Sequence, residues 1–222
     1  MNTILIAGAT GLIGSDTLRQ ALADERVERV ILLVRKPIHT ANAKLEQWVA
    51  HDGDLLSALR NEHVDGVICC LGTTIRNVGG DKQKFIHVDK DLVLGLGQWA
   101  KHNNVRCFGM VSAMGADAKS RVFYSRVKGE TEDALRTLGL PQLHLFRPSI
   151  LTGPRKENRA GERIGIAIAK FLSPLMIGPL QPYKPMPSDL LAKALLNASL
   201  GATSSETVQT HTFRSIELLA HG

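Results

Sequence analysis

The chain has 222 residues, of which 44% are hydrophobic and 22% charged, and it carries a formal net charge of +6. This composition is that of an ordinary globular protein and excludes disordered, collagen-like and low-complexity chains. The length suits one domain, expected over residues 1–222, that buries enough surface to fold without a disulfide or a metal. The three cysteines lie in apolar runs and are expected to be buried free thiols, as in a reducing compartment.

Short apolar runs alternate with segments of helical period along the first two thirds of the chain. Strands are predicted at residues 3–7, 29–34, 47–50, 66–70, 106–111 and 142–146. Helices are predicted between them at residues 12–24, 55–61, 82–102 and 123–138. Because the strands are apolar on both faces and alternate with helices, the pattern predicts an α/β fold: a Rossmann-type, doubly wound parallel sheet with helices on both faces.

The pattern changes after residue 146, where proline and glycine become frequent. A helix is predicted at 162–172, followed by a helix at 190–200, a strand at 208–213 and a short terminal helix. We expect residues 147–222 to add a small substrate-side elaboration to the same domain. A basic run in this region predicts either a solvated loop or recognition of an anionic substrate group. Its members are Arg155, Lys156, Arg159 and Arg163.

A glycine-rich turn follows the first predicted strand, with the sequence Gly8-Ala9-Thr10-Gly11-Leu12-Ile13-Gly14. In a dinucleotide-binding fold, such glycines permit the tight turn, the close approach of the pyrophosphate and the packing of the helix on the strand. The amides at the start of the helix then point at the phosphates. A plain strand-to-helix turn is the alternative. The cofactor contacts predicted here are Gly8, Thr10, Gly11, Leu12, Ile13 and Gly14.

The end of the second strand bears on the choice between NAD and NADP. A carboxylate usually binds the free ribose hydroxyls of NAD there, whereas in this chain Val34 is followed by Arg35 and Lys36. Two cations suit the 2′-phosphate of NADP, through their charge and through the planar guanidinium. NADP is therefore predicted in preference to NAD, and a solvated strand end is the alternative.

Two further turns are expected to face the cofactor. Asp54 and Leu55 follow the third strand, where Asp54 could accept a hydrogen bond from the adenine and also cap the helix that follows. Leu71, Gly72 and Thr73 follow the fourth strand, where Gly72 would let the loop pass close to the ribose and pyrophosphate. All five residues are predicted cofactor contacts.

A tyrosine and a lysine four residues apart, Tyr124 and Lys128, open the helix predicted at residues 123–138. Positions i and i+4 share one helix face, so the phenol and the ammonium can address one spot. The ammonium favours the phenolate and brings the pKa of the phenol toward the working range of proton transfer. The lysine can also bind the hydroxyls of a nicotinamide ribose. Taken alone, such a pair is more often a packed aromatic residue and an exposed lysine.

The glycine turn, the doubly wound pattern and the Tyr124–Lys128 pair together resemble the short-chain dehydrogenase/reductase family, over essentially the whole chain. Two strings are similar to its atypical branch, which includes the Tat-interacting-protein oxidoreductases and bacterial relatives: Cys70-Leu71-Gly72-Thr73-Thr74 and Ser112-Ala113-Met114-Gly115-Ala116-Asp117. The resemblance implies that the tyrosine is the general acid and base and that the lysine supports it. It also implies that Pro148 and Ile150 lie in a segment that touches the nicotinamide.

One position departs from the family pattern. The family serine, which polarises the substrate carbonyl or hydroxyl, is usually the second of a Ser-Ser or Ser-Thr pair, and here that pair is Ser112-Ala113. Ser112 is the predicted catalytic serine, provided that the strand end is turned, and Ser120 and Ser125 are alternatives. A missing hydroxyl would weaken transition-state stabilisation and leave cofactor binding intact. Many family members carry an asparagine near the floor of the active site at the position of Asp89. The alternative interpretation of Asp89 is a solvated helix residue.

The leading hypothesis is an NADP-dependent oxidoreductase in which Tyr124 donates or accepts the proton and Lys128 tunes it, with a small carbonyl or alcohol substrate. Epimerisation or dehydration through a transient oxidation would use the same residues. A regulatory or sensor protein that binds NADP(H) with little catalysis is the second hypothesis.

Nucleic-acid binding is the weakest hypothesis, because the chain has no reading motif and no interleaved aromatic residues. Residues 119–163 hold ten basic and five acidic side chains, so the positive charge is concentrated near the predicted cofactor mouth. We expect no nucleic-acid partner, no bound metal, no membrane span, a monomer or homodimer, and a cytoplasmic location.

Overall fold

The structure, a computed structural model, describes residues 2–153, 184–201 and 205–222. Its centre is a seven-stranded sheet with the order β3-β2-β1-β4-β5-β6-β9, in which every neighbouring pair is parallel. The strands are β1 (Asn2–Ala7), β2 (Val27–Val34), β3 (Leu45–Val49), β4 (Gly66–Cys69), β5 (Cys107–Val111), β6 (Leu143–Phe146) and β9 (Val208–His211). Strands are added on one side of β1 and then, from β4 onward, on the other, which confirms the predicted doubly wound parallel sheet.

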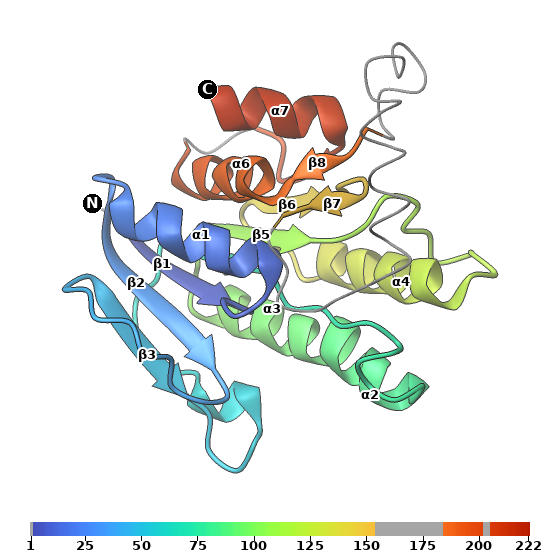
Figure 1. Ribbon diagram of the computed structural model, residues 1–222, viewed down its shortest axis with the longest axis horizontal. Helices are drawn as coiled ribbons and strands as arrows, with labels where there is room; N and C mark the ends of the chain where they lie inside the picture. The colour runs from blue at the N-terminus through green and yellow to red at the C-terminus, as the bar shows by residue number, and fades with distance from the viewer. Residues whose placement is uncertain (1, 154–183, 202–204) are drawn as a thin grey trace.

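Helices cover both faces of this sheet (Figure 1). One layer holds α1 (Leu12–Ala23), α6 (Ser188–Leu200) and α7 (Phe213–His221), and the other holds α2 (Lys82–Ile86), α3 (Leu92–His102) and α4 (Phe123–Thr137). Each layer encloses its own apolar cluster: Ile4 and Ile6 of β1 belong to the first, Leu5 and Ala7 to the second. Since successive residues of a strand point to opposite faces, this burial explains why the strands are apolar at every position.

The helix predicted at residues 82–102 is interrupted. A π-helical turn, η2 (His87–Asp91), separates α2 from α3. A π turn accommodates one extra residue in a helix and is frequent at functional sites. The apolar spacing of the sequence does not reveal it, because the register shift is only one residue.

The helix predicted at residues 55–61 is a single 3₁₀ turn, η1 (Leu55–Ala58). The Asp54 carboxylate caps this turn and accepts from the Leu56 amide at 3.0 Å. The capping role expected of Asp54 is therefore confirmed, although the helix is shorter than its sequence suggests.

The strand predicted at residues 208–213 ends at His211. Thr212 and Ser215 exchange hydrogen bonds in a capping box, which commits the following residues to α7. A capping box satisfies amides at the start of a helix, so residues 212 and 213 belong to the start of α7 and the strand stops two residues early.

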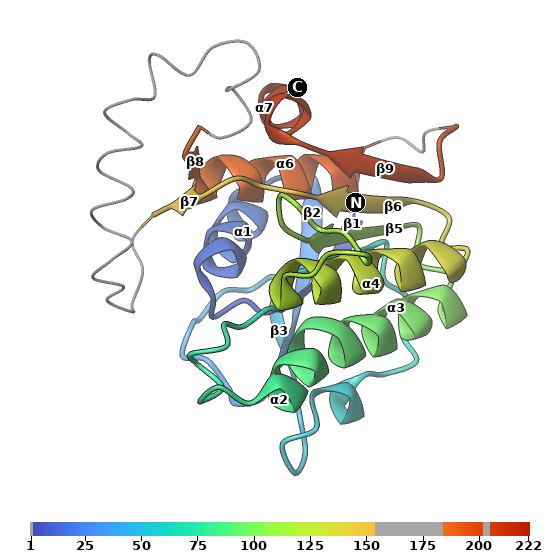
Figure 2. The same ribbon diagram turned by 90° about the vertical axis from the view of Figure 1, so that its right-hand side faces the viewer.

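Two short strands, β7 (Leu151–Thr152) and β8 (Met186–Pro187), pair in parallel, and β8 leads directly into α6. Figure 2 shows β9 beside β6, with the β7–β8 pair beyond the carboxyl end of β6. The helix predicted at 162–172 and the basic run at 155–163 lie outside the described residues. Within the described ranges, no helix combines the length and the apolar character needed to cross a bilayer.

Candidate functional site

The glycine-rich turn between β1 and α1 is packed closely against its surroundings. Gly8 has a φ of +84°, and a Cβ there would lie 2.6 Å from the carbonyl oxygen of Cys70. A Cβ on Gly14 would lie 2.2 Å from the carbonyl oxygen of Gly8. Both positions require glycine, the first for the turn and the second for the contact between helix and strand.

The start of α1 offers free backbone amides beside this turn. Gly11 occupies the N-cap position and has no side chain that could accept from the first amides, which belong to Leu12 and Ile13. Thr10 and Gly11 are exposed, and the next two residues are half-buried. Free amides at the positive end of a helix dipole suit an anion such as a pyrophosphate.

The loop after β4 joins the glycine turn to the other half of the site. At one end, Cys70 and Leu71 lie against Gly8. At the other end, the Thr73 amide donates to Asp89 Oδ2 at 2.8 Å. The loop therefore links the predicted phosphate-binding turn to the π turn between α2 and α3.

Tyr124 and Lys128 lie on the first turns of α4 and differ in exposure. The Tyr124 side chain is 42% exposed, and its ring packs edge to face on Phe85 with a centroid separation of 5.9 Å. Lys128 is only 3% exposed, and its Nζ lies 2.8 Å from Asp89 Oδ1. A Cβ on Gly72 would lie 3.6 Å from the same Nζ. Lys128 is therefore not the exposed lysine of a chance pair but a buried cation that faces the loop after β4.

Two opposing effects set the charge of Lys128. Burial by itself lowers the pKa of the ammonium, because the charge is withdrawn from water. The Asp89 carboxylate, and the negative charge that Tyr124 can carry, oppose this and leave the pKa above its ordinary value. Lys128 is therefore protonated at neutral pH and pairs with a wholly buried carboxylate.

Ser112, the predicted catalytic serine, is buried at the end of β5 and donates to Glu132 Oε1 at 2.5 Å. Glu132 is wholly buried and also accepts from Arg147 Nε at 2.9 Å, from Arg147 Nη2 at 2.6 Å and from Arg136 Nη2 at 3.2 Å. We call these four residues the Glu132 cluster. Among the described residues no hydrogen bond joins Ser112 to Tyr124, so the structure brings this serine to the cluster.

The segment after β6 runs beside the loop after β5. Pro148 is buried, and its carbonyl accepts from the Met114 amide at 3.0 Å. Ile150 is 48% exposed, and its carbonyl accepts from the Met186 amide at 2.9 Å. Of the two predicted nicotinamide contacts, therefore, only Ile150 presents an exposed side chain.

Six large apolar side chains of the described residues are more than a third exposed. Five of them follow the carboxyl ends of β4, β5 and β6 or open α4, and we call these five the apolar rim: Ile75, Met114, Val122, Tyr124 and Ile150. Single exposed apolar residues are common, but these five all follow the carboxyl ends of neighbouring strands or open α4, the edge where ligands bind in open α/β sheets.

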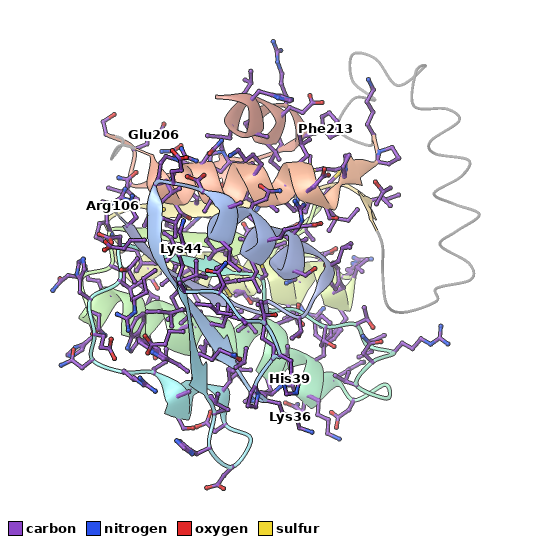
Figure 3. All side chains as sticks on the ribbon, turned by 60° about the vertical axis from the view of Figure 1, so that its left-hand side comes forward. Lys36, His39, Lys44, Arg106, Glu206 and Phe213 are labelled. Carbon is purple, nitrogen blue, oxygen red and sulfur yellow. The ribbon has the colours of Figure 1, made fainter. Side chains whose placement is uncertain are left out.

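Arg35 and Lys36 lie directly after the carboxyl end of β2, and both are exposed. In Figure 3, Lys36 lies close to His39 at the opposite end of the sheet from Arg106. Within the described ranges, neither Arg35 nor Lys36 takes part in an ion pair with a carboxylate. Both cations are therefore available to an external anion.

Asp54 and Leu55 follow β3, as predicted, but they face different surroundings. Asp54 is exposed and caps η1, whereas Leu55 is 4% exposed and packs in the apolar cluster on the α3 and α4 side of the sheet. A contact of Leu55 with a cofactor would therefore use its backbone. The cofactor contacts of both residues stay predictions.

Sequence reasoning did not identify Glu132, and it left open whether Asp89 is solvated. Asp89 is wholly buried, so the solvated alternative does not apply. Glu132 lies four residues after Lys128 on a helix face that also carries the buried Val127 and Leu135. Two charged residues on the apolar face of one helix are the signal that could have pointed to both contacts. The described residues contain no group of three or more His, Cys, Asp or Glu side chains that could hold a metal.

Comparison with known proteins gives a consistent picture. The family described as NAD(P)H-binding matches residues 8–163. Protein fmp52, mitochondrial, of Emericella nidulans is 31% identical over 93% of this chain and 91% of its own length. Protein HTATIP2 of Rattus norvegicus is 32% identical over 72% of this chain and 67% of its own. These similarities confirm the resemblance to the atypical short-chain dehydrogenases/reductases.

Solved structures share the fold at low identity. The UDP-glucose 4-epimerase of Thermotoga maritima, solved with UDP-glucose, has a TM-score of 0.68 at 17% identity and covers 99% of this chain and 82% of its own. MoeE5 in complex with UDP-glucose and NAD has a TM-score of 0.65 at 13% identity, with 99% and 81% covered. At these identities the likeness establishes the Rossmann-type fold alone.

The expectation of a cytoplasmic location is wrong as it stands. The fmp52 relatives of Emericella nidulans and Eremothecium gossypii are named mitochondrial proteins, which points away from a purely cytoplasmic location. The cysteines, all free thiols, still fit a reducing compartment. Composition did not identify the compartment, because it reports the redox state of the surroundings, whereas location depends on targeting signals.

Proposed function

The chain belongs to the NAD(P)H-binding family, within the atypical short-chain dehydrogenases/reductases, and we propose that it is an NADP-dependent oxidoreductase. Its substrate carries a reactive carbonyl or alcohol carbon. Tyr124 exchanges the proton with the substrate oxygen, and the buried Lys128 supports the phenol.

One observation carries the proposal: a single short stretch of chain, residues 70–73, contacts both halves of the site. Its first residues lie against Gly8, and its last is bound to Asp89, the partner of Lys128. The phosphate-binding turn and the Tyr124–Lys128 pair are thus held on opposite ends of one loop. This is the arrangement that a dinucleotide with a phosphate end and a reactive end requires.

The glycine turn fits such a cofactor. Gly8 and Gly14 are required by the packing of the chain itself, but a Cβ on Gly11 would meet only the Gly8 carbonyl oxygen, at 3.4 Å. The absence of a side chain at Gly11 therefore leaves the start of α1 open to a phosphate group. When bound, the cofactor supplies or takes up the hydride. The chain binds its phosphates through amides and holds the proton that accompanies the hydride.

The preference for NADP is supported by the two exposed cations after β2. Arg35 and Lys36 have no carboxylate partner among the described residues, and β2 ends in the apolar Val34 where a carboxylate would favour NAD. An arginine fork matches a 2′-phosphate, whereas a free ribose diol would gain little from two cations.

The proton transfer is supported by the contrast between Tyr124 and Lys128. The phenol is half-exposed and can reach a substrate, while its ring is fixed against Phe85. The ammonium is buried and stays charged, so it stabilises the phenolate that forms when the proton leaves.

The apolar rim favours a substrate with an apolar body next to its carbonyl group. Ile75, Met114 and Ile150 are exposed at the same edge of the sheet as Tyr124, so a hydrocarbon portion would cover them on binding. A sugar nucleotide would leave these side chains facing polar groups. We therefore propose an aldehyde or ketone, or the matching alcohol, with an apolar chain or ring.

One observation supports a second candidate function, that of an NADP(H) sensor with little catalysis. Ala113 takes the position of the family serine, and the hydroxyl of Ser112 is engaged by Glu132. A site without a positioned hydroxyl would bind the cofactor and lack one donor to the developing oxyanion.

The test measures binding and turnover separately. NADPH and NADH are titrated into the wild type and Tyr124→Phe, and both proteins are then assayed for NADPH oxidation with a panel of apolar aldehydes and ketones. We expect Tyr124→Phe to bind NADPH within about threefold of the wild type and to lose about 10²-fold or more in kcat, the scale of general acid–base catalysis. Binding without Tyr124-dependent turnover on any substrate would favour the sensor.

The cofactor preference is tested with two further variants in the same titrations. Arg35→Ala should weaken NADPH binding by about tenfold and leave NADH binding unchanged, since only NADPH carries the 2′-phosphate. Arg214→Ala, an exposed arginine on α7, is the control for a general loss of positive charge. Equal losses for both cofactors would overturn the NADP preference, and failure to bind either cofactor would overturn the function itself.

A further inference from the structure

The π turn η2 carries three charged side chains, and only one of them is buried. Lys90 pairs with Glu130 at 2.7 Å on the surface, and Asp91 lies 3.9 Å from His87. Asp89, between them, has no exposed area at all. An isolated carboxylate is costly to bury, so this position needs an explanation in its contacts.

Asp89 is held from three directions. The Thr73 amide donates to Oδ2 at 2.8 Å, and Lys128 Nζ lies 2.8 Å from Oδ1. The Thr131 hydroxyl donates to the Asp89 backbone carbonyl at 3.2 Å, so α4 fixes the main chain as well as the side chain. The carboxylate thus ties the loop after β4 to the lysine on which Tyr124 depends.

The contact of Asp89 with Lys128 joins two buried opposite charges. Lys128 Nζ lies 2.8 Å from Oδ1, and the described residues give this oxygen no other partner. Their mutual attraction is strengthened by the absence of water around the pair. Lys128, which interacts electrostatically with Tyr124, therefore has an opposite charge directly against it.

We propose that Asp89 positions the Lys128 ammonium and offsets its charge, so that Tyr124 faces less net positive charge than the lysine alone would present. An unopposed buried ammonium would favour the phenolate strongly. A paired one favours it less, while remaining able to respond to charge that develops on the phenol. An asparagine at this position could bind the Thr73 amide but could not offset the lysine.

The meaning of this inference for catalysis rests on the proposed function, but its test needs neither turnover nor a cofactor. The chain has two tyrosines, so in a Tyr183→Phe background the tyrosinate absorbance reports Tyr124 alone. The side-chain NMR signal of Lys128, assigned by comparison with Lys128→Met, reports the lysine. Because neighbouring groups titrate as a pair, the quantity compared is the pH at which the pair loses its first proton.

Asp89→Asn in this background should lower that pH by about one unit, because the negative charge that faces Lys128 has been removed and the pair then holds its first proton less tightly. Asp91→Asn is the matched control: the same substitution, two residues away in the same π turn, at an exposed carboxylate. It should change the titration by less than about 0.3 unit. A folded Asp89→Asn protein that titrates like the control would overturn the proposal.

A second variant keeps the proposal testable if Asp89→Asn does not fold. The double variant Asp89→Asn, Lys128→Met removes both charges and leaves neither unpaired in the interior. If the two charges offset each other, the midpoint for Tyr124 should stay within about 0.5 unit of the parent. A rise of about one unit or more would mean that the lysine acts unopposed in the parent, and would overturn the proposal. Absence of turnover in the wild type would instead count against the proposed function and would leave both titration results standing.

Discussion

Helix α4 buries two charged side chains one turn apart, and the two sets of contacts differ. Glu132 accepts four hydrogen bonds, from Ser112, Arg136 and twice from Arg147, so that both of its oxygens are fully used. Lys128 has one carboxylate partner, Asp89, and it interacts electrostatically with the half-exposed phenol of Tyr124.

The two buried charged side chains of α4 therefore have different roles. A buried charge whose bonding capacity is exhausted holds elements together, here α4 to the ends of β5 and β6. A buried charge with capacity left over can respond to a proton or a ligand. We therefore assign the Glu132 cluster to stability and the Asp89–Lys128 pair to the site.

The largest expected effect is on the stability of the Glu132 cluster. Glu132→Gln keeps the shape of the side chain but leaves Arg147 without its counter-ion, and we expect a loss of about 3 kcal/mol in the free energy of unfolding. Urea denaturation, with an unchanged m-value, measures this loss.

The control for that variant is the neighbouring residue. Asp133→Asn removes a carboxylate that is 64% exposed and pairs with Arg136 at 3.0 Å, and it should cost less than about 0.5 kcal/mol. If Glu132→Gln lowered the free energy of unfolding as little as this control does, the assignment of Glu132 to stability and of Lys128 to the site would be wrong.

We expect a smaller effect on the free energy of unfolding when the pH is lowered, through two buried histidines. His144 and His211, on β6 and β9, lie with Nδ1 and Nε2 2.9 Å apart and are both buried. Burial, with repulsion from His144, lowers the pKa of His211 from 6.5 to about 4, and burial lowers that of His144. The unfolded chain therefore binds more protons than the folded one between these values.

Stability should be highest above pH 6.5 and fall as the pH decreases toward 4, and the shift of His211 alone corresponds to at most about 3 kcal/mol. Urea midpoints at several pH values measure the slope, and His211→Asn should reduce it. His63→Gln, at a histidine whose side chain is 77% exposed, is the control that should leave it unchanged. A slope that His211→Asn does not alter would mean that this pair is not the acid-sensitive element.

The smallest effect concerns Ser112, which connects the two regions. Ser112→Ala removes one of four hydrogen bonds to Glu132, and we expect a loss of about 1 kcal/mol in stability. If the serine belongs to the Glu132 cluster, kcat should change by less than about twofold. A loss of about 10²-fold in kcat would return Ser112 to the catalytic residues, where the family pattern places it.

The sequence predicted the parts of the site that depend on local pattern. The glycine turn was readable because Gly8 and Gly14 allow contacts that no other residue permits. The Tyr124–Lys128 pair was readable because a helix places positions i and i+4 together. The Asp54 cap was readable for the same local reason, although the helix after it was predicted too long.

What the sequence did not reveal depends on partners that are distant along the chain. The contacts of Glu132 with Ser112 and Arg147 form only after β5, β6 and α4 have packed together, and the catalytic role of Ser112 stays a prediction. The apolar spacing of residues 82–102 did not reveal the single residue that the π turn inserts. For this reason the sequence did not reveal that Asp89 is buried.

The sequence by itself therefore determined the α/β fold, the glycine turn after β1 and the placement of Tyr124 and Lys128 on one helix, because each of these follows from neighbours within a few residues. Only the tertiary structure decided what the charges do. It paired Lys128 with Asp89, 39 residues earlier in the chain, and it saturated Glu132 with groups from two strands. The energy of a buried charge depends on the atoms that replace its water, and folding alone brings those atoms together.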